Sequence, residues 1–218
     1  GRCLAAAYYR IKGERNVVLD LKQIDKVVLN ALEEDMPYGD ITTDSLIPED
    51  RMVEAKFLAK ADGVICGMPV AERVFKLIDA RTTLEILKND GQAVQKGEIL
   101  AILRGPAAAV LKGERTALNL LQRLSGIATR THCFAGLVKD YPVSVADTRK
   151  TTPGLRYLEK YAVRCGGGRN HRYSLSDAVM LKDNHIAAGG GILSAVRTVR
   201  AGIPHTVKIE VEVENMDM

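Results

Sequence analysis

The second half of the sequence alternates between strand and helix patterns, and this alternation constrains the fold more than any other feature. The apolar stretch Pro142–Asp147 predicts a strand, and Asp177–Leu181 and Thr206–Val213 predict two more. The segments between them show helical patterns at Pro153–Val163 and Ile192–Arg200. Strands that alternate with helices in this way form a parallel sheet or a barrel. We therefore predict an α/β architecture built from βα units.

The first half of the sequence predicts a mixed α+β domain. Apolar residues at helical spacing predict an amphipathic helix at residues 20–35, and a turn-rich loop follows to residue 50. Alternating apolar and polar residues predict a strand at Val53–Ala59. The later patterns predict a helix at residues 69–78 and two strands at residues 83–87 and 98–103. A long helix is predicted at residues 106–139, with a candidate break at Ser125-Gly126. We expect two domains, 17–110 and 111–218, and an extension at residues 1–16 that matches no motif.

Charge and cysteine content argue against several classes of protein. The net charge is +4, and Lys and Arg are interleaved with Asp and Glu until Arg149, after which Arg gathers near Gly. A nucleic-acid binder usually shows a basic stripe, so this pattern favours a compact anionic ligand. The four cysteines lack zinc-binding spacing and are expected to be free thiols. Without a signal peptide or an apolar run of about 18 residues, we expect a cytoplasmic protein with no membrane segment.

The first predicted strand of the second half leads into Asp147-Thr148-Arg149-Lys150-Thr151-Thr152-Pro153-Gly154. In βα architectures the reactive side chains lie at the carboxyl ends of the strands. Here two cations and three hydroxyls stand where a helix begins, and a helix N-terminus favours bound anions. A solvated loop before a capped helix would explain Thr152 and Pro153 but not Arg149 and Lys150. We therefore predict that Arg149 and Lys150 bind an anion.

Two further polar segments follow. In the first, Gly166-Gly167-Gly168 allows the backbone to approach a ligand closely, and His171 and Arg172 supply hydrogen-bond donors. Such a glycine loop also serves as a plain helix terminator. In the second, a predicted strand ends in Lys182, with His185 three residues later. An apolar strand that ends in Lys, Asp, Asn and His is typical of an active-site rim, where His185 either contacts the ligand or supports a residue that does.

The last predicted strand, Lys208–Glu214, alternates glutamate with aliphatic residues. With a period of two, Glu210, Glu212 and Glu214 project to one face and the aliphatic side chains to the other. On an open sheet the glutamates would be solvated. Inside a barrel they would need cations or a metal to offset the cost of burial, and Mg²⁺ prefers such oxygen ligands. The residues alone thus indicate an enzyme that binds an anionic small molecule.

At these segments the sequence resembles the quinolinate phosphoribosyltransferase family. The resemblance runs from about residue 18 to the end, and it depends on four stretches: GERTALNLLQRLSGIATRT, DTRKTTPGLRYLEKYAVRCGGGRNHR, LKDNHI and KIEVEVE. It implies an N-terminal α+β open sandwich followed by an incomplete, TIM-like α/β barrel. It also implies a homodimer in which each N-terminal domain covers the barrel mouth of the partner.

The resemblance assigns roles to individual residues. Arg149 and Lys150 are expected to bind carboxylate and phosphate groups. The quinolinate pocket is expected to be completed by His171, Arg172 and Lys182. Arg115 resembles an arginine that the neighbouring subunit contributes, and Glu210 or Glu212 is expected to face the phosphoribosyl group and Mg²⁺, with Glu212 as the expected metal ligand. Lys150, Lys182, Glu210 and Glu212 are the expected catalytic residues.

The implied reaction transfers a phosphoribosyl group from phosphoribosyl pyrophosphate to quinolinate, with loss of CO₂. Two alternatives stay open: a paralogous pyrophosphorylase-like protein of molybdate uptake, and a truncated chain without catalytic activity. The uninterrupted TTPGLR and GGGRNHR favour the quinolinate enzyme. Family members are expected to continue past Met218 with further strands and phosphate-binding glycine loops, so we expect this chain to be truncated at its C-terminus.

Overall fold

The computed structural model describes residues 8–10 and 18–215, and the chain divides into two compact units, Gly1–Asn170 and His171–Met218. Each unit is described by itself. The boundary that we expected at residues 110–111 lies inside one helix of the first unit. Of the extension expected at residues 1–16, Tyr8–Arg10 forms β1, which pairs antiparallel with β2 (Val18–Asp20); the rest lies outside the described residues.

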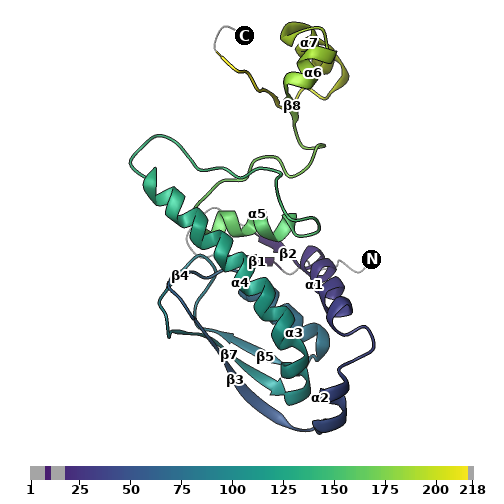
Figure 1. The fold of residues 1–218 in the computed structure, drawn as a ribbon, viewed down its shortest axis with the longest axis vertical. Helices are drawn as coiled ribbons and strands as arrows, with labels where there is room; N and C mark the ends of the chain where they lie inside the picture. Colours follow the sequence, from purple (N-terminus) through teal and green to yellow (C-terminus); the bar gives the residue numbers. More distant parts are fainter. Residues whose placement is uncertain (1–7, 11–17, 216–218) are drawn as a thin grey trace, which may run out of the picture. The chain divides into compact units, whose positions relative to one another are not determined.

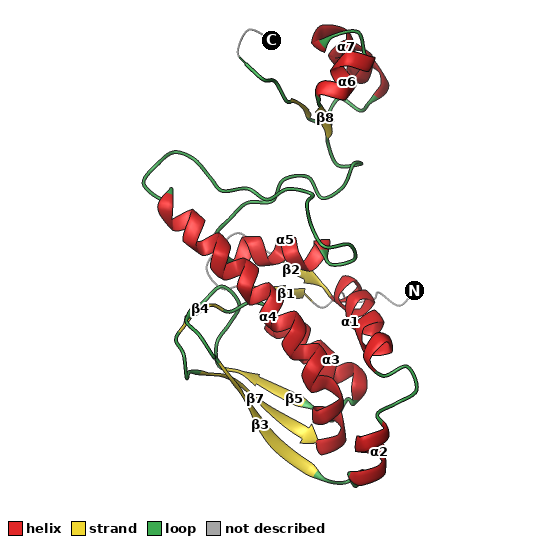
Figure 2. Ribbon diagram, viewed as in Figure 1, coloured by secondary structure: helices red, strands yellow, loops and turns green. Residues whose placement is uncertain are grey.

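The first unit is built on an antiparallel sheet in which β7 (Ile99–Pro106) lies between β3 (Met52–Leu58) and β5 (Thr83–Ile86) (Figure 2). All three strands are close to the ranges that the sequence predicts. β7 is mostly buried, as expected for a central strand that carries an apolar run. Beside this sheet, two two-residue strands pair with each other, β4 (Gly63–Val64) and β6 (Ala93–Val94).

The main core of the first unit contains residues of α1 (Leu21–Asp35), α3 (Met68–Ile78), α4 (Ala107–Leu137) and α5 (Arg156–Cys165) (Figure 1). α3 and α4 lie side by side and approach closely at Gly113, where an added Cβ would stand 2.8 Å from the ring of Phe75. The core is aliphatic with little aromatic content; its most buried members include Ile24, Val28, Met68, Val74, Phe75, Leu103, Ala117, Leu124 and Leu158.

The break that we expected in the long helix is wrong, because α4 continues unbroken for 31 residues. Glycine inside a helix costs about 1 kcal/mol relative to alanine. Burial of Leu121 and Leu124 before Gly126, and of Ala128 after it, outweighs that cost. The Ser125 hydroxyl, which could have disturbed the helix, instead accepts a hydrogen bond from the backbone N–H of Cys66 at 3.0 Å.

A short helix, α2 (Ile41–Leu46), occupies the segment that we expected to be only a loop. Its signal is Asp40, whose carboxylate accepts hydrogen bonds from the backbone N–H groups of Thr42 and Thr43 at 3.0 and 3.1 Å. An aspartate in this position satisfies donors that have no partner within the helix. The expected loop is therefore corrected to a capped helix between two turns.

The buried carboxylate of Asp90 joins three parts of the first unit. It accepts hydrogen bonds from the backbone N–H groups of Gly67 and Met68, at 2.8 and 2.9 Å, and from the Tyr161 hydroxyl at 2.7 Å. It thereby caps α3 from outside the helix, where Gly67 itself has no side chain to do so. Because only hydrogen bonds offset its burial, the pKa of the Asp90 carboxyl is raised by desolvation.

The predicted strand Pro142–Asp147 is absent from the described structure, which has only an isolated parallel bridge between Ala146 and Arg169 there. Val143 is 60% exposed, so the apolar pattern of this segment does not reflect a buried face. The next predicted element is confirmed: α5 (Arg156–Cys165) falls within two or three residues of the expected helix.

The second unit contains a parallel βα arrangement, as the sequence predicts. β8 (Val179–Leu181) pairs in parallel with β9 (Ile209–Val211), and α6 (Asp183–Ala188) and α7 (Ile192–Gly202) lie between them in the chain. Both strands are shorter than expected, with three residues each. α6 was not predicted. The aliphatic side chains of β9 pack against the small core of this unit, as expected from the alternation with glutamate.

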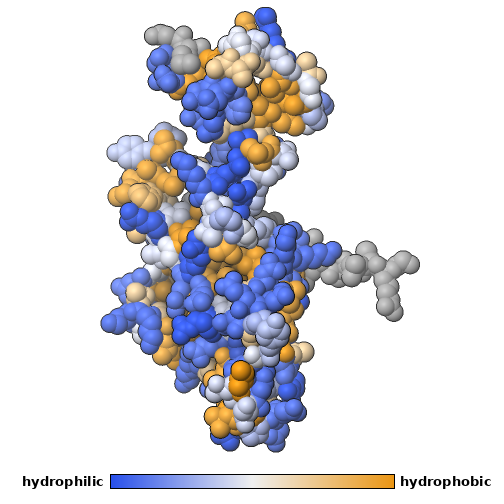
Figure 3. Space-filling model, turned by 45° about the vertical axis from the view of Figure 1, so that its right-hand side comes forward, coloured by the Kyte–Doolittle hydropathy of each residue, from blue (hydrophilic) through white to orange (hydrophobic). Residues whose placement is uncertain are grey.

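Hydrophilic residues cover much of the face drawn in Figure 3, with hydrophobic residues gathered in separate groups. Among the described helices, none has both the length and the apolar character needed to cross a membrane. Cys66 and Cys165 are buried free thiols and Cys133 is an exposed one, in agreement with the prediction for the three described cysteines.

Candidate functional site

The loop Asp147–Thr152 of the first unit presents the two cations that the sequence identified. Lys150 is exposed and Arg149 half-buried. The Nε atom of Arg149 is buried and has no hydrogen-bond partner among the described residues. Burying a guanidinium N–H without an acceptor costs free energy, so this atom is suited to a ligand that brings its own acceptor.

The hydroxyls of this loop organise its backbone and its neighbours. Thr148 Oγ1 accepts a hydrogen bond from the backbone N–H of Lys150 at 3.0 Å, and Thr151 Oγ1 accepts one from Arg156 Nε at 3.0 Å. A cavity of about 200 Å³ opens beside the loop and is lined by Thr148, Lys150 and Thr151, together with residues of α4 and α5. Its size suits a group such as a carboxylate or a phosphate rather than a whole nucleotide.

In the second unit, the structure brings four of the predicted residues into two pairs. His171 Nε2 lies 2.8 Å from Glu210 Oε2, and Lys182 Nζ lies 3.2 Å from Glu212 Oε2. The parallel pairing of β8 with β9 explains the second pair, because Leu181 is in register with Val211 and the residues that follow, Lys182 and Glu212, emerge together. Both glutamates are exposed, and each lies beside a nitrogen atom of a second predicted residue.

The remaining predicted residues of the second unit are held by backbone contacts. Arg172 Nη1 donates a hydrogen bond to the carbonyl of Ala178 at 2.8 Å. His185 Nδ1 accepts a hydrogen bond from the backbone N–H of Lys182 at 3.2 Å. His185 therefore bonds the backbone of Lys182 at the start of α6, and its role toward a ligand stays a prediction.

Arg115 is exposed on α4. Within the described residues, no hydrogen bond or ion pair joins it to another candidate residue. The structure therefore brings together His171 with Glu210 and Lys182 with Glu212, and among the described residues it shows no bond between Arg115 and the loop Asp147–Thr152.

Carboxylates are the groups available for a magnesium ion. Glu210 and Glu212 are exposed and offer oxygen atoms, which Mg²⁺ prefers, and this ion commonly takes only one or two carboxylates together with phosphate oxygens of a substrate. The described residues contain one cluster of three other potential ligands, formed by Cys66, Asp90 and Cys165. Its buried thiols are unsuited to Mg²⁺, and burial raises the pKa of the Cys66 thiol. Glu210 and Glu212 are the better match.

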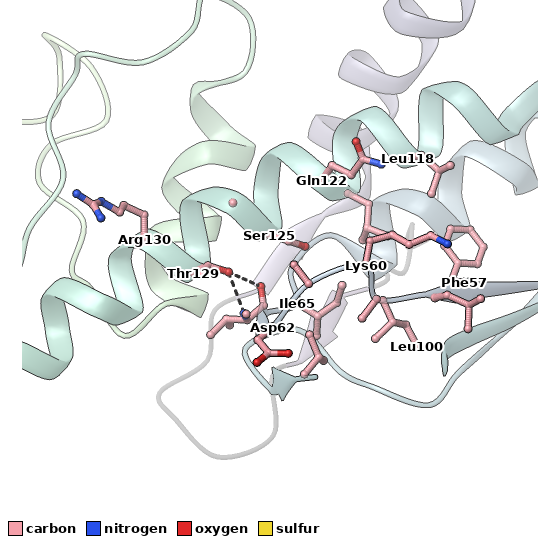
Figure 4. Close-up of a pocket in the computed structure, with 18 of the residues that line it drawn as sticks. Phe57, Lys60, Asp62, Ile65, Leu100, Leu118, Gln122, Ser125, Thr129 and Arg130 are labelled. Atoms are coloured by element: carbon pink, nitrogen blue, oxygen red, sulfur yellow. Dashed lines mark hydrogen bonds between the residues drawn. The ribbon is translucent and has the colours of Figure 1, made fainter. Parts of the chain in front are cut away.

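A larger cavity lies elsewhere in the first unit. It measures about 550 Å³, and α4, the end of β3 and the segment around β4 line it (Figure 4). Its walls are mainly apolar, with Phe57, Ile65, Leu100 and Leu118 among them. Apolar cavities often bind ligands, yet this one contains none of the eight predicted site residues and no constellation for group transfer.

Sequence reasoning missed the residues that fix the loop Asp147–Thr152 from behind. Lys160 forms an ion pair with Asp147, and Glu159 bonds Arg123 and the backbone of Thr152. Both belong to the helical segment LEKYA, where charged residues look like a solvated helix face. Their position in the helix that directly follows the cationic loop was a better indication that they contact the loop than their charge was.

Comparison with known proteins decides the family. The model of the quinolinate phosphoribosyl transferase N-terminal domain matches residues 40–125, and the model of the C-terminal domain matches residues 127–218. A crystal structure of NadC from Streptococcus pyogenes superposes with a TM-score of 0.88 at 42% identity, covering 94% of this chain and 72% of that one. The chain belongs to the quinolinate phosphoribosyltransferase family.

Curated relatives of this family agree. A probable nicotinate-nucleotide pyrophosphorylase (carboxylating) of Synechocystis is 47% identical over 194 residues, or 89% of this chain. The protein of the same name from Bacillus subtilis is 48% identical over 192 residues, or 88% of the chain. The chain spans 65% and 66% of the lengths of these two relatives. The predicted family and fold class of the quinolinate phosphoribosyltransferases are thus confirmed; the roles of the site residues stay predictions.

Proposed function

We propose that the protein catalyses phosphoribosyl transfer from phosphoribosyl pyrophosphate to quinolinate, with decarboxylation, giving nicotinate mononucleotide, CO₂ and pyrophosphate. Relatives at 47% and 48% identity carry the name of this activity. The structural observation that carries the proposal is the loop Asp147–Thr152, where two cations, several hydroxyls and the partnerless buried Nε of Arg149 favour an anion.

The chemistry needs cations around the substrates and carboxylates near the sugar. The ring nitrogen of quinolinate forms a bond to C1 of the ribose while the C1–oxygen bond to pyrophosphate breaks and its electron pair leaves with the pyrophosphate. Positive charge develops on the sugar in the transition state. Glu210 and Glu212 would stabilise that charge, and Arg149 and Lys150 would stabilise the departing phosphates.

Decarboxylation follows from the first step. The ribosylated ring is a pyridinium, so the bond between C2 and its carboxylate can break, with the electron pair held on C2 until a proton replaces CO₂. His171, Arg172 and Lys182 would orient the two carboxylates of quinolinate through charge-assisted hydrogen bonds. This mechanism requires no protein nucleophile.

Mg²⁺ is proposed as the cofactor, with Glu212 as its protein ligand. The ion would supply neutralising charge for the pyrophosphate group. We further propose a cytoplasmic homodimer with shared active sites, in which Arg115 serves the site of the partner. Arg115 is exposed, and among the described residues no hydrogen bond or ion pair joins it to another candidate residue, which supports this assignment.

A calorimetric titration of quinolinate, with nicotinate as the control ligand, tests the substrate. Because the proposed pocket holds two adjacent carboxylates, quinolinate should bind and nicotinate should bind much more weakly. Arg149→Ala should lose quinolinate affinity, whereas Arg81→Ala should not, since Arg81 is an exposed arginine paired with Asp79 outside the site. Equal affinity for the two ligands would refute the two-carboxylate pocket.

Mixing two inactive variants tests the shared site. Arg115→Ala and Arg149→Ala should each abolish turnover of quinolinate. If Arg115 serves the partner, a hybrid dimer carries one site with both arginines, and a mixture of the variants should regain activity. Absence of any recovery, when exchange of subunits is verified, would place both arginines in the same site of one chain.

A further inference from the structure

Two adjacent residues of α5, Glu159 and Lys160, are buried although both are charged. Lys160 is 0% exposed and Glu159 is 7% exposed. A buried charge is costly unless it is paired and hydrogen-bonded. Both side chains find their partners outside α5, and the partners lie at opposite ends of the cationic loop Asp147–Thr152.

Lys160 fixes the first residue of the loop. Its Nζ forms an ion pair with Oδ1 of Asp147, whose side chain is 8% exposed. Asn170 completes this contact by donating its Nδ2 hydrogen atoms to Asp147 Oδ2 at 2.6 Å and to the carbonyl of Lys160 at 2.8 Å. The backbone N–H of Asp147 also donates to the carbonyl of Arg169 at 3.0 Å. The side chain and the backbone of Asp147 are both held.

Glu159 fixes the last residue of the loop. Its Oε2 accepts a hydrogen bond from the backbone N–H of Thr152 at 3.2 Å, and its Oε1 accepts one from Arg123 Nε of α4 at 2.8 Å. Arg123 also donates to the Thr152 hydroxyl. The pair Glu159–Arg123 therefore holds Thr152 through its backbone and its side chain.

We propose that Glu159 and Lys160 are positioning residues that hold the loop Asp147–Thr152 at both ends, so that Arg149 and Lys150 are preorganised for the anionic substrate. The inference rests on the proposed function, because it specifies how that site is held. The residues between the two anchors carry both cations of the loop and the hydroxyls of Thr148 and Thr151. Both anchors also line the same 200 Å³ cavity as Lys150.

A purely structural role would give a different result from a positioning role. Removing one partner of a buried ion pair lowers the free energy of unfolding whether or not the pair positions the loop, so a loss of stability alone does not distinguish the two roles. Misplacing a reacting group by about 1 Å, in contrast, can reduce turnover by roughly 100-fold. Measuring both the free energy of unfolding and kcat/KM on the same variants therefore distinguishes a structural role from a positioning role.

The test uses Lys160→Met and Glu159→Gln, which remove charge with little change of size, and Asp147→Asn combined with Lys160→Met. In steady-state assays we expect kcat/KM for quinolinate to fall by roughly 10- to 100-fold in each single variant. Because Asp147 and Lys160 act as one unit, the double variant should lose little more than Lys160→Met alone. Arg73→Met is the control, since Arg73 pairs with Asp25 between α3 and α1, away from the loop.

Hydrogen exchange provides a readout that does not depend on activity. Lys160→Met should accelerate exchange of the Asp147 amide, and Glu159→Gln that of the Thr152 amide, while amides of β7 stay unchanged. Unchanged loop exchange, or lower thermal stability with unaltered kcat/KM, would overturn the inference. If the wild-type protein does not convert quinolinate, the proposed function fails, and the exchange data alone still decide whether Glu159 and Lys160 hold the loop.

Discussion

The two compact units differ in how much apolar structure supports their charged residues. The first unit has an extended core that spans the sheet and helices α1, α3, α4 and α5. The buried core of the second unit consists of Leu181, Ile186 and Ala195, with partly buried neighbours. Yet this smaller unit carries most of the predicted site residues: His171, Arg172, Lys182, Glu210 and Glu212.

The ion pair beside the cationic loop of the first unit differs in the same direction from the Lys182–Glu212 pair of the second unit. Lys160 and Asp147 are 0% and 8% exposed in their side chains, whereas Lys182 and Glu212 are 47% and 64% exposed. Exposed pairs contribute about 0–1 kcal/mol, and removing one partner of a buried pair costs about 3–5 kcal/mol. The comparison indicates that the first unit buries the ion pair at the start of its cationic loop, while the second unit presents Lys182 and Glu212 in an exposed pair on a βα unit with a small core.

The largest effect is expected from Phe75→Ala in the first unit. Phe75 is 2% exposed and makes an edge-to-face contact with Phe57, with ring centroids 6.1 Å apart. Its removal should lower the free energy of unfolding by about 3–5 kcal/mol, measured by urea titration with hydrogen exchange followed separately in each unit. Ile186→Ala is the control in the second unit, and its effect should leave exchange in β3 and β7 unchanged. Loss of protection in both units from either variant would show that they unfold as one.

A smaller loss is expected from Gly166→Ala, at the contact between α5 and α4. A Cβ there would lie 2.3 Å from the carbonyl oxygen of Ala128 and 2.6 Å from Thr131 Cβ. Such overpacking costs about 1–3 kcal/mol, which thermal or urea unfolding would detect. Gly126→Ala in α4 is the matched control, because nothing lies within 4 Å of its Cβ position, and it should stabilise by about 1 kcal/mol. Equal effects of the two substitutions would contradict the close approach at Gly166.

These glycines illustrate which parts of the fold the sequence could predict. The βα order of the second unit followed from periodicity, because helix and strand periods differ and each period reports a buried face. The break at Gly126 was wrong because a local cost of about 1 kcal/mol competes with burial along a 31-residue helix, and burial depends on contacts from distant parts of the chain. The helix α2 was missed although Asp40 signals its start, because its six residues provide too short a period to recognise.

The candidate site was predictable to a similar extent. Cations and carboxylates that follow strand patterns identified Arg149, Lys150 and Lys182 as candidates, and the register of β8 with β9 now explains why Lys182 meets Glu212. Glu159 and Lys160 were missed because a sequence cannot distinguish a charged residue that faces solvent from one that faces a buried partner 13 residues earlier. That distinction depends on tertiary packing.

The buried carboxylate of Asp90 gives the first unit a pH dependence. Burial raises the pKa of Asp90 above its unfolded value, so the native state holds this proton more tightly. The contribution to stability is fully present below the unfolded pKa of about 3.9 and is lost as the pH rises through the native pKa. In Asp90→Asn the free energy of unfolding should no longer change with pH through this group. A pH-independent decrease of about 1 kcal/mol should remain, because the substitution alters the cap of α3. Urea midpoints between pH 3.5 and 7 measure the difference, and parallel pH profiles of the two proteins would contradict it.

The smallest effect on stability is expected in the second unit, from Lys182→Met. Because the Lys182–Glu212 pair is largely exposed, its loss should change the free energy of unfolding by less than about 1 kcal/mol. The same substitution removes a charged donor from the proposed quinolinate pocket, so affinity for quinolinate should fall by roughly tenfold or more. Calorimetry and urea unfolding on one sample give both values, with Lys22→Met, at an exposed position of α1, as the control for charge. A large loss of stability would mean that the exposed ion pairs of the second unit stabilise it more than its small core does. The contrast between a buried, stabilising ion pair in the first unit and a nearly neutral, exposed one in the second would then be wrong.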